Sequence, residues 1–190
     1  MKKTTPFISF VLFTIITTSS FAQSQEQMQK WMEYMTPGAM QQMLAKADGS
    51  WSEELTMWET PDAPPQKMTA SCENKMILGG RYQESVHTGN FNNMPFEGHG
   101  LVAYDNTRKV FQSTWIDNMG TGIINMEGTY DPATMMLTLT GKETDPTAGK
   151  ETDVKQTLKF IDDNNQLLEM YRVQDGKEFK MMEIKLTRKS

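Results

Sequence analysis

Cysteine and histidine are scarce in this chain of 190 residues, which contains one cysteine, Cys72, and two histidines, His87 and His99. A single cysteine excludes an internal disulfide, so the fold must be held by packing even in an oxidising compartment. It also leaves no second thiol for a closed zinc site of the usual kind. We therefore expect structural roles for both histidines, a place in an ordinary strand for Cys72, and neither a metal site nor a cofactor.

Positive charge is also in short supply, since 19 lysines and arginines stand against 24 acidic residues and give a formal net charge of −5. Such a surface disfavours nucleic acid and anionic membranes as partners. The sequence lacks a phosphate-cradling glycine pattern and a nucleophile elbow. The catalytic residues, if any, are therefore unknown, and we expect a binding protein rather than an enzyme.

Long apolar runs are absent, because none reaches the roughly 20 residues that a transmembrane helix needs. The longest, at residues 7–16, follows Lys2-Lys3 and precedes the small-x-small segment Ser20-Phe21-Ala22. This pattern predicts a secretory signal peptide over residues 1–22, cleaved before Gln23. With no cysteine there to carry a lipid, we expect a periplasmic or secreted protein without a stable membrane anchor.

Residues 23–48 are predicted to form one or two short helices. Apolar side chains recur at helical spacing through Met28, Trp31, Met32 and Met35, and resume after Thr36-Pro37 up to Gly49. Thr36 is the expected cap of the second helix, with the proline in its first turn.

Methionine is abundant, with 17 residues, of which Met28, Met32, Met35, Met40 and Met43 lie in this helical segment. Their thioethers could bind Cu(I), which prefers soft ligands. They could equally form the apolar face with which the helices cover the rest of the protein. A copper site and an apolar packing face require the same helical spacing, so the spacing does not distinguish them.

Residues 49–190 are predicted to be a single β domain. Nine turn-like breaks divide it into about ten short strands, at residues 62–65, 79–80, 89–95, 105–106, 118–120, 131–132, 145–149, 162–165 and 175–176. No helical pattern separates them, which excludes βαβ units. Because strand twist accumulates and exposed edges aggregate, we expect a mainly β, antiparallel up-and-down barrel.

Two sets of residues resemble known barrels. Gly49-Ser50-Trp51 is similar to the start of the first strand in lipocalin-like barrels, where the tryptophan closes the floor under a basic residue of the last strand. Here Arg188 would supply that cation over Trp51. The resemblance implies structural roles for both residues.

Six blocks, in order along the chain, are residues 77–82 (ILGGRY), 96–101 (FEGHGL), 104–106 (YDN), 114–119 (TWIDNM), 127–131 (EGTYD) and 176–183 (GKEFKMME). Together they resemble a bacterial family known as domain of unknown function 1579. The resemblance implies one barrel-like domain, often exported, with no established activity and no catalytic residues to carry over.

Aromatic residues supply the best candidates for a binding site. Strand alternation places Phe111 with Trp115 and Asp117 on one face, and Phe96 with Tyr104 on one face of the preceding strand. Adjacent strands would thus present one aromatic wall, joined by Met126 and Tyr171, to a small hydrophobic ligand. If the barrel is filled, the same residues form its core.

Carboxylates offer an alternative. Glu169 and Glu183 lie on the two arms of the last predicted hairpin, and a pair sharing one face would raise one pKa toward a useful range for a hydrolase or isomerase. The register decides whether they meet. Asp117 is expected either to line the barrel mouth or to cap a turn.

The function that we expect is an exported binding protein holding a small hydrophobic molecule in a β-barrel. The alternatives are a barrel-mouth enzyme that uses a carboxylate, a structural or assembly protein, and a methionine-rich copper handler.

Overall fold

The computed structural model describes residues 16–174 and 176–189. Residues 1–15, and with them most of the predicted signal peptide, lie outside the described residues. The elements are α1 (Ile16–Met35), α2 (Ala39–Ala45), β1 (Gly49–Met57), β2 (Gln66–Ile77), β3 (Tyr82–Phe91), β4 (Met94–Asp105), β5 (Val110–Asp117), β6 (Ile124–Asp131), β7 (Met136–Asp145), β8 (Lys150–Asp162), β9 (Asn165–Gln174) and β10 (Lys177–Arg188). The chain divides into two compact units, with α1 in the first and all other elements in the second.

The helix α1 is amphipathic, and large apolar side chains along it are exposed. Met28, Trp31, Met32 and Met35 are all exposed. Its polar side is tied by an ion pair one turn apart, in which Lys30 Nζ lies 2.6 Å from Glu26 Oε1. In the described part of the chain, no helix has both the length and the hydropathy to cross a membrane.

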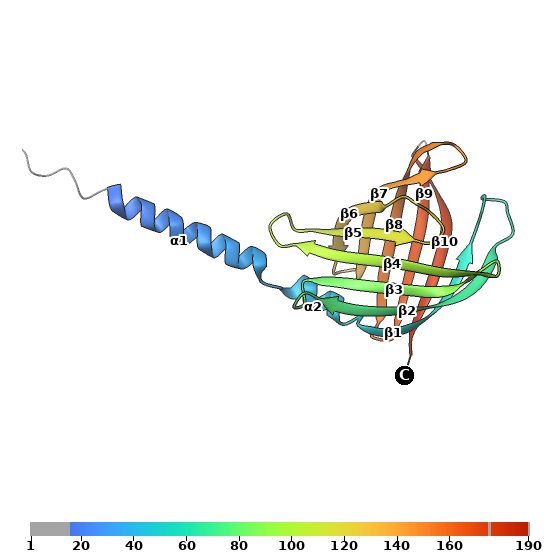
Figure 1. The fold of residues 1–190 in the computed structure, drawn as a ribbon, viewed down its shortest axis with the longest axis horizontal. Coiled ribbons are helices and arrows are strands. Elements are labelled where there is room, and N and C mark those ends of the chain that lie inside the picture. The colour runs from blue at the N-terminus through green and yellow to red at the C-terminus, as the bar shows by residue number, and fades with distance from the viewer. Residues whose placement is uncertain (1–15, 175, 190) are drawn as a thin grey trace, which may run out of the picture. The chain divides into compact units, whose positions relative to one another are not determined.

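The second unit is a closed antiparallel barrel of ten strands (Figure 1). Each strand pairs with the next, and β1 pairs with β10 in a register that sets Trp51 opposite Arg188 and Met57 opposite Met182. Closure leaves none of the ten described strands at an unpaired edge. The predicted fold class is confirmed.

Aspartates at strand ends explain why the predicted breaks coincide with the turns. In each case the carboxylate accepts hydrogen bonds from backbone N–H groups two or three residues on, which stabilises a turn. Asp145, for example, accepts from the N–H groups of Thr147 and Ala148 at 2.9 and 3.0 Å. The same arrangement is found at Asp105, Asp131 and Asp162.

The helix α2 closes one end of the barrel and lies beside β2, β3 and β4. Leu44 is 2% exposed and packs into the core. The Gln41 side-chain amide donates hydrogen bonds to Tyr104 O at 3.1 Å and to Asn106 Oδ1 at 3.2 Å, and Gln83 Nε2 donates to Leu44 O at 2.6 Å. Buried amides therefore satisfy the backbone groups of this short helix and of the turn that it covers.

The prediction that Thr36 caps the second helix is wrong. Its hydroxyl donates to Met32 O at 2.6 Å, one turn back along α1, so that its oxygen serves the end of the first helix. Gly38 is the residue before α2, and its N–H donates to Gln41 Oε1 at 2.8 Å. The helix ends at Ala45, and Gly49 already belongs to β1, with a φ of 112°.

Trp51 and Arg188 join α2 to the barrel floor. The Trp51 side chain is 0% exposed, and its indole N–H donates to Ala47 O at 2.9 Å. The Arg188 guanidinium lies 4.4 Å above the ring and donates to Asp48 O and Lys46 O, both at 2.5 Å. Arg188 therefore contacts both the Trp51 ring and the backbone of residues 46–48, which connect α2 to β1.

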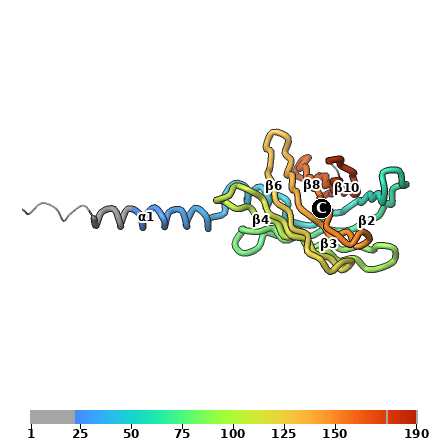
Figure 2. Tube along the Cα trace, turned by 90° about the horizontal axis from the view of Figure 1, so that it is seen from above, coloured from blue at the N-terminus to red at the C-terminus, as the bar shows by residue number. Residues whose placement is uncertain are grey.

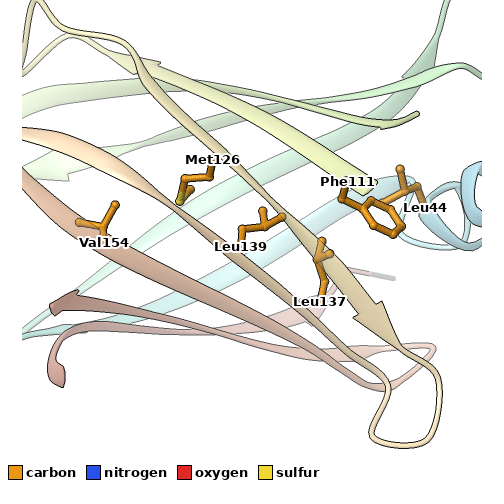
Figure 3. Packing of buried hydrophobic residues seen from close by; sticks show 6 residues of the cluster. All are labelled: Leu44, Phe111, Met126, Leu137, Leu139 and Val154. Atoms are coloured by element: carbon orange, nitrogen blue, oxygen red, sulfur yellow. The ribbon is translucent and has the colours of Figure 1, made fainter. Parts of the chain in front are cut away.

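Two clusters of buried side chains pack inside the barrel. The first consists of Leu44, Phe111, Met126, Leu137, Leu139 and Val154. Figure 3 shows Leu44 beside Phe111 and Val154 at the opposite end of this row. The second consists of Ala47, Trp51, Cys72, Ile184 and Leu186.

The other end of the barrel carries the β1–β2 loop and the β3–β4 turn, away from α2 in both views (Figures 1 and 2). Pairing of β2 with β3 stops at Ala70 and Gly89, and beyond it lies an open hollow of about 620 Å³ lined by Gln66, Lys67, Met68, Asn90, Asn92 and Asn93. We call this end the mouth. Inner-face side chains such as Leu55, Trp115 and Met170 are partly exposed, so solvent reaches part of the inner wall.

Candidate functional site

An aromatic group occupies the inner wall on the mouth side. The Trp115 ring stacks on Phe96, with centroids 6.5 Å apart and planes at 23°, and meets the His87 ring edge-on at 5.0 Å. A Cβ on Gly98 would lie 2.5 Å from Trp115 Cζ2, so glycine at this position lets the ring lie across β4. The structure thus brings together two residues of the predicted wall and adds a histidine.

The remaining predicted aromatic residues form a separate group in the core. Tyr104 and Phe111 have ring centroids 4.8 Å apart. Phe111 is 0% and Met126 6% exposed, and Tyr104 packs against their cluster. These three residues therefore belong to the filled part of the barrel.

Asp117 fixes the indole of Trp115. Its Oδ2 accepts from Trp115 Nε1 at 2.8 Å, while its Oδ1 accepts from the N–H groups of Met119 and Gly120 at 2.9 and 3.0 Å. One carboxylate orients the ring and caps the β5–β6 loop. The rotamer of Trp115 is thereby set from the rim of the barrel.

The paired carboxylates meet on the outer face of the barrel. A bulge between Lys180 and Met182 sets Glu183 directly opposite Glu169 in the β9–β10 register. Both alternate with side chains that pack inside, such as Leu168. Lys180 Nζ lies between them and donates to Glu169 Oε1 at 2.9 Å and to Glu183 Oε2 at 2.6 Å.

This outer cluster is electrostatically unlike a catalytic acid. Burial raises the pKa of Glu169, but hydrogen bonds from Lys180 and from the Tyr171 hydroxyl outweigh it, so that the pKa lies below its ordinary value. A general acid near neutral pH needs the opposite shift. Glu169 and Tyr171 lie on the outer face, apart from the aromatic group on the inner wall. The lowered pKa of Glu169 gives no support to an enzyme that uses this carboxylate.

A polar cluster on the inner wall joins three adjacent strands, and sequence reasoning missed it. Glu53 on β1 and Cys72 on β2 are 2% and 3% exposed. His87 on β3 lies between them, with Nδ1 at 2.9 Å from Glu53 Oε1 and Nε2 at 3.6 Å from Cys72 Sγ. Burial, and then the nearby charge of Glu53, raises the pKa of the Cys72 thiol.

Alternation along β1 is the sequence signal that points to one member of this cluster, Glu53. Glu53 shares a strand face with Trp51 and Leu55, so the floor tryptophan marks it as an inner residue. The second histidine of the chain, His99, lies outside this cluster. His99 is exposed and bonds to Glu97 at 2.8 Å, far less buried than the inner cluster.

Two buried polar atoms on the inner wall lack a hydrogen-bond partner among the described residues, Ser113 Oγ and Arg172 Nε. The strand register links them through Met126, Gly141 and Val154 in one row across five strands. Buried polar groups are nearly always paired, so water or a bound molecule would be the partner of such an atom.

The predicted methionine face has two environments. Met40 and Met43 pack against the cluster around Leu44, where the flexible thioethers fill space. Met28 and Met32 belong to α1 and are exposed. Within the barrel unit, the methionines of the helical segment therefore act as core residues.

The fold and this site define a class of protein, an up-and-down β-barrel that is filled at one end by a short helix and carries aromatic and polar side chains on its inner wall. The chain belongs to the family described as "Protein of unknown function (DUF1579)", whose model matches residues 36–188. This match confirms the resemblance of the six sequence blocks. No curated protein matches the chain.

Two solved structures are similar to this chain to different degrees. Rv2717c from M. tuberculosis, known from a crystal structure, superposes with a TM-score of 0.58 at 15% identity, covering 82% of this chain and 100% of that one. A redesigned β-barrel gives a TM-score of 0.40 at 11% identity, over 77% and 95% of the two chains. The likeness to Rv2717c is a likeness of fold.

Proposed function

We propose that this protein is an exported carrier, periplasmic or secreted, that holds a small, largely hydrophobic molecule in the mouth half of the barrel. One observation carries the proposal. The inner wall presents stacked aromatic rings at Phe96 and Trp115, together with two polar atoms, on Ser113 and Arg172, that have no partner within the described part of the chain. Binding sites for small molecules combine apolar walls with a few fixed polar groups.

The polar atoms indicate what the ligand carries. Arg172 Nη2 donates to Glu143 Oε1 at 3.2 Å, whereas the buried Nε has no partner among the described residues. Ser113 Oγ can both donate and accept. An apolar molecule bearing two oxygen atoms, one for each residue, would satisfy both.

Native mass spectrometry tests the proposal, with protein purified from the periplasm or the medium of the cells that naturally produce it. We expect a small molecule that travels with the wild-type protein and is lost from Trp115→Ala. Trp58→Ala is the matched control, because Trp58 follows β1 and lies under Lys180 of the outer cluster, 5.4 Å from ring centroid to Nζ. An empty wild-type spectrum, or equal loss from both variants, would contradict the carrier.

Export is tested separately by sequencing the mature N-terminus. We expect it at Gln23, the residue after the small-x-small segment. An intact Met1 on protein from the same cells would overturn this part of the proposal.

A further inference from the structure

The cluster of Glu53, Cys72 and His87 has donors that a carrier of hydrophobic molecules does not require. Replacing a buried polar pair by apolar side chains is often neutral or stabilising, so stability is a weak reason to keep one. A thiol and an imidazole on adjacent strands, with a carboxylate behind the imidazole, are, however, a common arrangement at transition-metal sites. Their ligand atoms all lie within 4.8 Å of one another.

We propose that this cluster is a binding site for a thiophilic transition-metal ion of the zinc class, with Cys72 Sγ and His87 Nε2 as direct ligands. Bonds of about 2.0 to 2.3 Å in a tetrahedral site place neighbouring ligand atoms about 3.3 to 3.8 Å apart. The distance between Sγ and Nε2 is 3.6 Å. An ion can therefore bridge the two atoms without a shift of β2 against β3, whose register already pairs Cys72 with His87.

Glu53 acts on the ion through the histidine. Its Oε1 lies 2.9 Å from Nδ1, where it accepts the N–H and so leaves the lone pair of the ring on Nε2, facing the thiol. A carboxylate behind a ligating histidine is a frequent device for orienting the ring, and its loss typically weakens metal affinity 10- to 100-fold. Glu53 is thus a positioning residue rather than a ligand.

The remaining coordination positions are left to water or to a bound molecule. Trp115 packs edge-on against His87 at 5.0 Å, so the aromatic group adjoins the proposed ion. Two protein ligands make an exchangeable site, unlike a closed structural zinc site. The inference does not rest on the carrier proposal, because a metal ion and an organic ligand differ in mass and are detected separately.

Cobalt titration of metal-free, full-length mature protein tests the site, since Co²⁺ bound by a thiolate gives a charge-transfer band in the near ultraviolet. We expect one Co²⁺ per chain, displaced by Zn²⁺. The band should vanish in Cys72→Ser and His87→Asn, and Glu53→Gln should weaken binding 10- to 100-fold. His99→Asn is the matched control, because it removes the other histidine–carboxylate pair, which is exposed.

Circular dichroism checks that each variant is folded, and Glu53→Gln keeps the test valid if Cys72→Ser fails to fold. Zn²⁺ should also raise the unfolding temperature of the wild-type and His99→Asn proteins but not of His87→Asn. The proposal is overturned if the wild-type protein gives no thiolate band. It is overturned equally if His87→Asn binds Co²⁺ as tightly as His99→Asn does.

Discussion

Replacing Arg188 by methionine tests how the barrel floor is held. The guanidinium donates to the carbonyl oxygens of Lys46, Asp48 and Asp163 and lies 4.4 Å above the Trp51 ring. Three hydrogen bonds at a net value of about 0.5 to 1.5 kcal/mol each, with about 0.5 to 2 kcal/mol for the cation over the ring, set the scale. Because the group is partly exposed, we expect a loss of about 2 to 4 kcal/mol in the free energy of unfolding.

Urea unfolding followed by circular dichroism measures this loss as a lower midpoint at an unchanged slope. Arg188→Lys should fall between wild type and Arg188→Met, since an ammonium keeps the charge over Trp51 but cannot serve three carbonyls. Arg81→Met is the control, because Arg81 is exposed and its guanidinium donates a hydrogen bond to a neighbouring turn carbonyl, Leu78 O, at 3.1 Å. Equal midpoints for Arg188→Met and Arg81→Met would refute the reasoning.

Two further predictions concern the outer cluster and the sheet. Burial raises the pKa of Glu169, but hydrogen bonds from Lys180 and Tyr171 lower it by more, so the net shift is downward. The ionised Glu169 therefore stabilises the folded protein above about pH 4.3, the usual pKa of a glutamate. This stabilisation is lost as the pH falls through the lowered pKa. The difference in unfolding free energy between wild type and Glu169→Gln should therefore shrink between about pH 6 and pH 3, and a gap independent of pH would contradict this. A Cβ on Gly128 would lie 1.8 Å from Thr138 O, so Gly128→Ala should lower the unfolding temperature sharply in a thermal melt. Gly122→Ala, whose Cβ would lie in ordinary van der Waals contact with Thr144 Oγ1 at 3.7 Å, should change the unfolding temperature little.

The barrel could be predicted because each of its signals is local. Aspartates and glycines mark the turns, and alternation within each strand places Trp115 and Phe111 on one face. Alternation does not tell how far along the barrel axis a side chain lies, and so whether it is in the filled part or near the mouth. Phe111 therefore lies in the filled half and Trp115 on the mouth side, although they are four residues apart on one strand.

The candidate site depends on relations between strands, which is why most of it escaped prediction. Glu53, Cys72 and His87 come from three strands, and their contact requires the registers of both β1–β2 and β2–β3. The register of Glu169 and Glu183 depends on a bulge at Lys180, which no sequence pattern announced. A shift of one residue would have changed which side chains meet.

The seam between β1 and β10 has a consequence for how the chain folds. Nine of the ten strand pairings join neighbours in sequence, so their hairpins can form rapidly and locally. Only the seam joins the two ends of the domain, and it needs Arg188 to reach Trp51. Because chains are synthesised from the N-terminus, the barrel remains an open, curved sheet with two bare edges until its last strand emerges. Closure of the barrel therefore has to wait for the final strand, β10. A truncation that removes β10 should leave β1 and β9 as two unpaired edge strands, both open to aggregation.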